Sequence, residues 1–190
     1  MHNFYLQLVN QQHPWKSSNH SPQLVQARYA EEKIFIDSKV NHQFNQLLEA
    51  LQLTDRIMIV DGHRTVAEQK QLWNYSLNAH GVNYTKNYVA SPGCSEHHTG
   101  LAIDLGLRKT EHDLIAPRFE GPEAELFLQH MKDYGFILRY PKNKQKITGI
   151  AYEPWHFRYV GTPHSQIIMD HGWTLEEYIE FLKHPIEAVS

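Results

Sequence analysis

The sequence predicts an α+β fold, a single domain with a small antiparallel sheet flanked by helices. Stretches with helical periodicity come first along the chain, and short apolar stretches typical of strands follow, with one helix between them. The length of 190 residues lies within the usual range of one domain. We therefore expect one domain over residues 1–190, with residues 1–22 as a peripheral polar segment.

The first helix is expected directly after a short strand at 33–36. Asp37 or Ser38 can cap this helix, because either side chain accepts a hydrogen bond from a backbone N–H of the first turn. The helix should run to about residue 52. Its apolar side chains recur at helical spacing, and they are Val40, Phe44, Leu47, Leu48 and Leu51.

A second strand and helix are expected around the sequence DGHRT. The apolar run 57–60 is typical of a buried strand, and the residues after it favour a turn. Thr65 and Glu68 form a capping-box pattern, so a helix should begin there. It is expected to end near Gly81, where a long loop to residue 96 begins.

The second half of the chain is expected to supply most of the sheet. Strands are expected at 101–107, 136–140, 147–152 and 155–160. A helix should separate the first two strands, with Pro122 in its first turn and Gly135 at its end. Two short helices are expected after Thr162 and after Trp173.

Composition restricts the partners and the compartment. The net charge is −3 and no basic cluster occurs, so nucleic acid is not an expected partner. No apolar run approaches the roughly 20 residues of a membrane span, and the N-terminus does not resemble a secretory signal. A single cysteine, Cys94, excludes an intrachain disulfide and suits a reducing compartment. We therefore expect a cytoplasmic protein without a membrane span.

Two segments, SEHHTGLAID and EPWH, can supply a catalytic metal site. A catalytic zinc ion commonly takes three ligands from His, Asp or Glu and leaves a fourth position for water. Such a set can be made by His97, Asp104 and His156. His98 competes with His97 for the ligand role, and spacing alone does not choose between them.

A carboxylate beside such a site can act as a general base. Glu153 precedes His156 by three residues, a spacing that places the two side chains on opposite faces of a regular strand. Pro154 interrupts that regularity, so a bend can bring both side chains into one pocket. Glu153 is then a candidate to take a proton from a metal-activated water.

An arginine follows the expected buried strand in the sequence DGHRT. Arg64 can hold a carbonyl oxygen that becomes negative in a transition state, or it can be a surface residue near a helix N-terminus. The residues alone leave these two interpretations open.

Together these segments resemble the zinc D,D-peptidases of the M15 family, whose pattern is Ser-x-His-x-x-Gly-x-Ala-x-Asp followed by Glu-x-x-His. Both motifs match at every fixed position, and the similarity extends to DGHRT, YGFILRYP and ITGIAYEPWHFRYVG. It covers about residues 5–180. At that level the chain is similar to the VanXY-type bifunctional D,D-dipeptidases and D,D-carboxypeptidases of vancomycin resistance. The chain departs from the family at His63, where the family prefers Tyr.

The resemblance implies one zinc ion per chain. Its ligands would be His97, Asp104 and His156, so the resemblance selects His97 over His98. It implies Glu153 as the general base, which later gives its proton to the leaving amine.

The resemblance also implies substrate-binding roles near the metal. Arg64 would polarise the scissile carbonyl, and Ser95 would help to bind the C-terminal carboxylate of the substrate.

Asp61 and Gln69 lie near Arg64 in the sequence and are further candidates for substrate binding. Asp61 can pair with the ammonium group of a dipeptide, or it can only cap the turn at Gly62.

The activity implied is zinc-dependent hydrolysis of the D-Ala-D-Ala dipeptide and of the C-terminal D-Ala of peptidoglycan precursor pentapeptides. One alternative is an L,D-carboxypeptidase or a peptidoglycan endopeptidase on the same scaffold, differing in pocket shape. A second alternative is a non-catalytic zinc-containing binding module. The presence of both Glu153 and Arg64 disfavours that second alternative.

Overall fold

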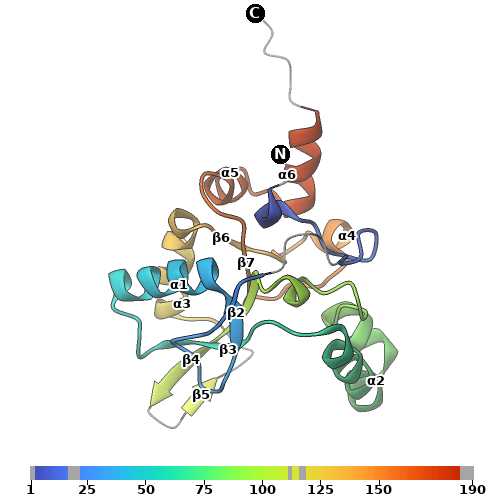
Figure 1. The fold of residues 1–190 in the computed structure, drawn as a ribbon, viewed down its shortest axis with the longest axis horizontal. Helices are drawn as coiled ribbons and strands as arrows, with labels where there is room; N and C mark the ends of the chain where they lie inside the picture. Colours follow the sequence, from blue (N-terminus) through green and yellow to red (C-terminus); the bar gives the residue numbers. More distant parts are fainter. Residues whose placement is uncertain (1–2, 17–21, 111–112, 116–118, 185–190) are drawn as a thin grey trace, which may run out of the picture.

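Five strands form the central sheet of the computed structural model, in the order β3-β4-β7-β6 with β5 paired to β4 (Figure 1). The structure describes residues 3–16, 22–110, 113–115 and 119–184. The strands are β3 (Ile57–Asp61), β4 (Ala102–Thr110), β5 (Asp113–Ile115), β6 (Phe136–Leu138) and β7 (His156–Tyr159). All of these pairs are antiparallel, so the predicted antiparallel sheet is confirmed.

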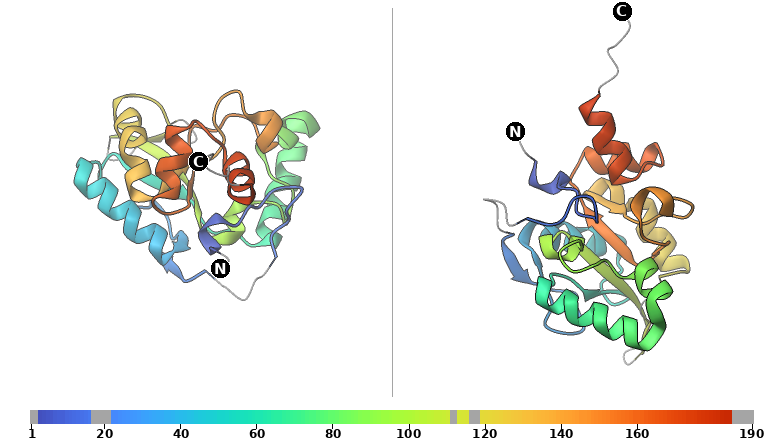
Figure 2. Two further views of the ribbon diagram at one scale, coloured as in Figure 1. Left: turned by 90° about the horizontal axis from the view of Figure 1, so that it is seen from above. Right: turned by 90° about the vertical axis from the view of Figure 1, so that its right-hand side faces the viewer.

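Helices flank this sheet on both sides. They are α1 (Ser38–Leu51), α2 (Val66–Tyr88), α3 (Pro122–His130), α4 (Gln145–Thr148), α5 (His164–Asp170) and α6 (Leu175–Lys183). Short 3-10 helices are η1 (Phe4–Leu6), η2 (Glu96–Thr99) and η3 (Met131–Tyr134). The views agree that α1 and α3 lie together on one side of the sheet and that α2 lies on the other (Figures 1 and 2).

The main core lies between the sheet and the α1–α3 side. Phe44 of α1 packs against Phe127 of α3, with ring centroids 6.2 Å apart. Phe127 in turn packs against Phe157 of β7 at 5.0 Å. Because side chains alternate across a strand, burying Phe157 in this core leaves His156 to face the opposite side of the sheet.

Helix α1 follows its prediction closely. The side chain of Asp37 caps it by accepting the N–H of Lys39 at 2.9 Å. Four of the five predicted apolar residues are fully buried, and Leu51 is partly buried. Residues 35–37 form strand β2 (Phe35–Asp37), which pairs with β1 (Leu24–Gln26) in a separate two-stranded sheet.

Helix α2 is longer than expected from the sequence. Thr65 and Glu68 form the expected capping box. The helix breaks at Gly81, with φ of 80° and ψ of 173°, but a helical segment resumes and continues to Tyr88. The prediction of a loop over 82–96 is therefore wrong for residues 82–88. Gly81 changes the direction of the chain, and the residues after it contain no further Gly or Pro to prevent a new helical turn.

The predicted strand at 147–152 is also wrong. Helix α4 occupies its first residues and ends at Gly149, which has a φ of 77°. The residues from Gly149 to Glu153 form no strand, and β6 and β4 both pair with β7 instead. Both edges of β7 are thus taken within the described residues.

The two ends of the described chain lie close together. Figures 1 and 2 show the segment around η1 next to α6. The guanidinium of Arg158 in β7 donates to the backbone carbonyls of Tyr5 and Gln7, at 3.1 and 2.8 Å. The N-terminal segment is therefore tied to the central sheet. Among the described residues no helix is both long and apolar enough to cross a membrane.

Candidate active site

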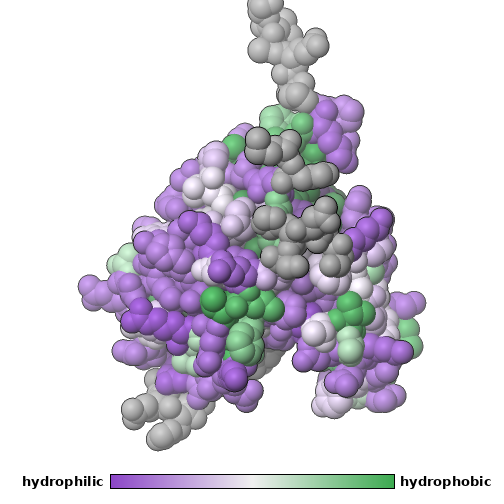
Figure 3. All heavy atoms as spheres, in the orientation of Figure 1, coloured by the Kyte–Doolittle hydropathy of each residue, from purple (hydrophilic) through white to green (hydrophobic). Residues whose placement is uncertain are grey.

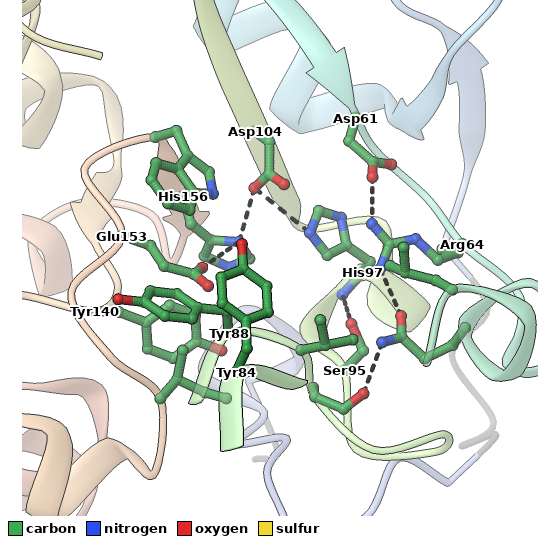
Figure 4. Close-up of a pocket in the computed structure, with 16 residues that line it drawn as sticks. Asp61, Arg64, Tyr84, Tyr88, Ser95, His97, Asp104, Tyr140, Glu153 and His156 are labelled. Atoms are coloured by element: carbon green, nitrogen blue, oxygen red, sulfur yellow. Dashed lines mark hydrogen bonds and ion pairs between the residues drawn. The ribbon is translucent and has the colours of Figure 1, made fainter. Parts of the chain in front are cut away.

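A pocket of about 200 Å³ opens between α2 and the sheet (Figure 4). It contains all eight residues selected from the sequence: Asp61, Arg64, Gln69, Ser95, His97, Asp104, Glu153 and His156. The space-filling view shows a notch between the surface over α2 and the surface over the sheet, and hydrophilic residues cover most of that face (Figure 3). The volume is below the roughly 300–1,000 Å³ of pockets for drug-sized ligands, so it suits the end of a short peptide.

The three predicted metal ligands converge in this pocket. His156 of β7 is the cross-strand partner of Asp104 of β4, and its Nδ1 atom lies 2.8 Å from Oδ1 of Asp104. His97 comes from η2 and brings its Nε2 atom to 3.5 Å from the same oxygen. Their ligand atoms lie within 4.8 Å of one another. Two imidazoles and one carboxylate form a ligand set suited to zinc.

Backbone hydrogen bonds distinguish the two adjacent histidines. His97 Nδ1 lies 2.6 Å from the carbonyl oxygen of Gly62, which can only accept, so Nδ1 carries the proton and the Nε2 lone pair can bind a cation. In His98, Nε2 accepts the N–H of Gly93 at 3.2 Å, and Nδ1 donates to the carbonyl of Arg64 at 2.6 Å. Both ring nitrogens of His98 are therefore engaged, which leaves His97 as the candidate ligand.

Two glycines allow the chain to place His97 here. A Cβ atom on Gly62 would lie 2.6 Å from the carbonyl oxygen of Phe35, a distance that real Cβ atoms do not reach, so only glycine fits. Gly100 ends η2 with a φ of 71° and leads the chain into β4. Ser95 caps the other end of η2, because its hydroxyl accepts the N–H of His97 at 3.3 Å.

Glu153 enters the pocket through a turn at Pro154 and Trp155. The N–H of His156 donates to the carbonyl of Glu153 at 3.4 Å, and Glu153 Oε2 lies 3.9 Å from His156 Nδ1. The expected bend is thus confirmed. Burial raises the pKa of Glu153 to about 8, against the opposing charges of His156 and Arg64. A carboxyl group that titrates near neutral pH is suited to take and return a proton.

The guanidinium of Arg64 is held at the pocket by two neighbours. Nη1 donates to Oε1 of Gln69 at 2.5 Å, and Nη2 donates to Oδ2 of Asp61. Gln69 is fixed in turn, because its amide donates to the carbonyl of Ala90 at 2.7 Å. The side chain of Arg64 is only 13% exposed, so the interpretation as a surface arginine is wrong.

The geometry agrees with a comparison to protein families. The family model VanY, described as D-alanyl-D-alanine carboxypeptidase, matches residues 33–162, which include every residue of this site. The chain belongs to the VanY family of D-alanyl-D-alanine carboxypeptidases. The resemblance read from the motifs is therefore confirmed, and the protein is an enzyme of the peptidase class.

Individual VanY-family relatives span almost the whole chain. The "Bifunctional D-Ala-D-Ala dipeptidase and D-Ala-D-Ala carboxypeptidase VanXYC" of Enterococcus gallinarum is 52% identical over 183 residues, 95% of this chain and 96% of the relative. Among solved structures, the D,D-dipeptidase VanXYg in complex with a D-Ala-D-Ala phosphinate analog is 41% identical with a TM-score of 0.88, covering 97% of this chain and 75% of that chain.

Two further solved structures show the same fold. The LD-carboxypeptidase LdcB is 35% identical with a TM-score of 0.78, covering 91% of this chain and 84% of that one. A mutant of the vancomycin resistance D,D-pentapeptidase VanY in complex with Zn(II) is 30% identical with a TM-score of 0.77, covering 93% of this chain and 99% of that one. The VanY fold is therefore found in enzymes described as D,D-peptidases and as L,D-peptidases.

Four aromatic residues complete the lining of this VanY-family pocket, and none of them is among the site residues selected from the sequence. Tyr140 is buried, and its ring lies 4.8 Å from that of His156. Tyr84 and Tyr88 reach the pocket from the end of α2, with rings 4.8 Å apart. They were missed because their segment was predicted as a loop. Trp155 lines the pocket and also packs against the main core.

A buried ion network, formed by Glu96, Arg139, Arg158 and Glu176, lies behind the metal ligands. Oε1 of Glu96 lies 2.7 Å from Nε of Arg139 and 2.9 Å from Nη1 of Arg158. Arg139 also makes two bonds to Glu176, at 2.7 and 2.8 Å. Burial alone would raise the pKa of Glu96, but the two arginines outweigh it and hold that pKa well below its usual range. Glu96 is therefore a buried, charged carboxylate.

Proposed function

We propose that this chain is a zinc-dependent D,D-peptidase. It hydrolyses the D-Ala-D-Ala dipeptide and removes the C-terminal D-Ala of peptidoglycan precursor pentapeptides. The observation that carries this proposal is the convergence of the cluster His97, Asp104 and His156 with Glu153 and Arg64 in one pocket. The 52% identity to VanXYC, which has both of these activities, supports the choice of substrates.

The donor set supports zinc as the cofactor. His97 presents Nε2, His156 presents Nδ1 and Asp104 presents a carboxylate oxygen toward one point. Three such ligands leave a position open for water in a tetrahedral site. When bound, zinc supplies a water of pKa about 7 and an electrophile for the scissile carbonyl.

Glu153 has the position of the general base. Its carboxylate lies 3.9 Å from His156 Nδ1, and the residue is buried at the pocket wall. There it takes a proton from the attacking water and later gives that proton to the nitrogen of the leaving D-alanine. The two transfers balance, because the amide nitrogen gains the proton that the water loses.

Arg64 binds the carbonyl oxygen of the scissile peptide bond, and Ser95 binds the C-terminal carboxylate of the substrate. Arg64 donates to the carbonyl oxygen, which becomes negative as water adds to the carbon. Asp61 and Gln69 hold the guanidinium in place for that contact. The Ser95 hydroxyl, on the pocket wall next to the ligand His97, binds the C-terminal carboxylate of the substrate.

We place this activity in the cytoplasm, where D-Ala-D-Ala and the nucleotide-linked pentapeptide are made. The single cysteine supports that placement, since the chain uses no disulfide. Activity there removes precursors that end in D-Ala-D-Ala and spares those that end in another residue.

The deciding experiment measures D-alanine release from D-Ala-D-Ala and from a pentapeptide stem. It is run on the untreated enzyme, after chelation, and after zinc is added back. We expect release from both substrates, loss on chelation and recovery with zinc. Release that survives complete metal removal would overturn the metal-dependent mechanism.

A tetrapeptide stem ending in an L,D bond serves as the third substrate, because the LD-carboxypeptidase LdcB shares this fold at 35% identity. Faster hydrolysis of the tetrapeptide than of both D,D substrates would assign the chain to L,D-carboxypeptidases. Zinc and ligand binding without turnover of any of the three would assign it to non-catalytic binding modules.

A further inference from the structure

Unpartnered buried atoms gather behind the metal cluster. Among the described residues, four buried side-chain polar atoms have no hydrogen-bond partner; one of them, Arg158 Nη1, still forms an ion pair with Glu96 Oε1, and two others belong to Glu96 and His156. Buried polar atoms normally have partners, so such a group requires an explanation. These last two atoms, Glu96 Oε2 and His156 Nε2, face each other at 3.7 Å.

The position of the proton on the His156 ring explains why Glu96 Oε2 and His156 Nε2 face each other without another partner. Nδ1 of His156 points at Asp104 and is the atom available to a metal ion. A neutral imidazole that binds a cation through Nδ1 carries its proton on Nε2. The facing carboxylate oxygen of Glu96 is a free acceptor, and a closure of less than an ångström from the present distance of 3.7 Å would complete the hydrogen bond.

We propose that Glu96 is a positioning residue for the metal centre, which accepts the Nε2–H of His156 and so holds the ring with Nδ1 toward the cation. This inference rests on the metal site of the proposed function. Glu96 does not touch the substrate pocket, since it is buried behind the ligands and does not line it. Its effect is therefore on metal affinity and acts through His156.

The same network links the metal centre to both ends of the chain. Arg139 spans from Glu96 to Glu176 of α6, and Glu176 also accepts from Asn10 at 3.2 Å. Arg158 spans from Glu96 to the backbone carbonyls of the N-terminal segment. The segments at both ends lie outside the family-matched residues 33–162. The ends of the chain therefore help to hold Glu96 against His156.

The net charge of the buried ion network also affects the metal site. The two carboxylates and two guanidiniums of the network sum to zero, and all but Glu176 have fully buried side chains. Neutralising Glu176 would leave one excess positive charge behind His156. That charge would draw the Glu96 carboxylate toward Arg139 and would also disfavour a cation at the metal site.

Zinc affinity is the decisive measurement, made on metal-free full-length protein by competition with a chromophoric chelator. For Glu96→Gln we expect zinc binding weaker by about 10–100-fold, the usual effect of mutating the hydrogen-bond partner of a ligand histidine, because a neutral amide oxygen is a weaker acceptor than a carboxylate. For Glu176→Gln we expect about tenfold weaker binding, the lower end of that range. Glu177→Gln is the matched control, because Glu177 is the next residue on α6 but pairs with Lys144; its zinc affinity should match the wild type.

The outcomes separate this inference from the proposed function. Wild-type protein that binds no zinc would overturn the metal centre itself. If the wild type binds zinc and a folded Glu96→Gln variant binds it with the same affinity, only the positioning role of the Glu96 carboxylate is overturned. Weakened binding in Glu96→Gln with no change in Glu176→Gln would overturn the link to α6.

A measurement on the wild type covers the case in which Glu96→Gln does not fold. Imidazole ¹⁵N spectra of the zinc-loaded protein report which nitrogen of His156 carries the proton. We expect a slowly exchanging proton on Nε2. A proton that exchanges with solvent as fast as that of an exposed histidine would contradict the hydrogen bond to Glu96.

Discussion

Asp104 and His156 are direct cross-strand partners in β4 and β7, and their side chains meet 2.8 Å apart on the pocket face of the sheet. A slip of one residue in this pairing would turn one of the two side chains to the opposite face. The register is held by the buried neighbours Ile103 and Phe157, which face the core. The metal cluster therefore depends on hydrophobic packing on the far side of the same strands.

Replacing Glu153 with Gln should lower the rate of hydrolysis without changing the amount of zinc bound. The amide keeps the size of the side chain but cannot take a proton, so we expect kcat for D-Ala-D-Ala to fall about 10²–10⁴-fold. Zinc stoichiometry should stay at the wild-type value, since Glu153 is not in the ligand cluster. Glu125→Gln, at an exposed position of α3, is the control. A Glu153→Gln rate within tenfold of wild type would assign the proton transfer to another group.

Replacing Arg64 with Lys should lower turnover strongly although the charge is kept. An ammonium cannot reproduce the planar fork that bonds Asp61 and Gln69 at once. Loss of a donor to the developing oxyanion costs about 10²–10³-fold in kcat, and we expect a fall of that size, measured by D-alanine release.

Gln69→Leu should lower the same rate by a smaller factor, because Arg64 loses one of its two supports while keeping its own donors. The neighbouring exposed Lys70→Ala is the control and should be neutral. Equal rates in Gln69→Leu and Lys70→Ala would show that Asp61 alone suffices to place the guanidinium.

Replacing Asp61 tests whether this residue favours the dipeptide over the pentapeptide as substrate. Its Oδ1 atom accepts the N–H of Gly62 at 2.8 Å, which confirms the turn cap, and its Oδ2 atom pairs with Arg64. Pairing with the dipeptide ammonium is a separate prediction. Asp61→Ala should lower kcat/KM for D-Ala-D-Ala by about tenfold more than for a pentapeptide, since a hydrogen bond to a charged group contributes about 1.5–3 kcal/mol.

Asp61→Asn keeps the shape and the turn cap but removes both the charge and the acceptor that Oδ2 offers to Arg64, so both rates should fall and the dipeptide rate should fall further. Dipeptide and pentapeptide rates that fall together in both variants would show that Asp61 acts only through the turn and Arg64.

Gly62→Ala should destabilise the protein and weaken metal binding. The added Cβ would lie 2.6 Å from the backbone carbonyl of Phe35 and 2.7 Å from side-chain carbons of Ile34 and Ile36. Overpacking of this kind costs about 1–3 kcal/mol of unfolding free energy, which urea unfolding of the metal-free protein measures. Because the Gly62 carbonyl orients His97, zinc affinity should fall as well.

Gly81→Ala is the comparison for this change, since its Cβ meets no atom within 4 Å and only the positive φ is strained. Zinc affinity in Gly81→Ala should equal the wild-type value. Unchanged zinc affinity in a destabilised Gly62→Ala variant would separate the close packing at Gly62 from the orientation of His97.

Local signals in the sequence were sufficient for much of the fold and of the site. Helix α1 follows from the Asp37 cap and from apolar side chains at helical spacing, and α2 begins at its capping box. The residues of the metal cluster were selected because SEHHTGLAID and EPWH carry a complete zinc ligand set. These features depend on neighbours in the chain and on the chemistry of the residue types, which a sequence displays directly.

Other features depended on contacts between distant segments. The strand predicted at 147–152 is absent: its first residues lie in α4, and β6 pairs with β7, the distant segment 156–159, which local propensity does not report. Tyr84 and Tyr88 reach the pocket only because a helical turn resumes after Gly81.

The sequence by itself determined the residue types of the candidate site: the three candidate metal ligands, the proposed base and the arginine. Tertiary structure decided how they are held. It selected Nε2 of His97 through the Gly62 carbonyl, and it brought Glu96 behind His156 with two arginines around it. The reason is physical, since hydrogen bonds and buried charges depend on distances between atoms far apart in the chain, and only packing of the whole fold sets those distances.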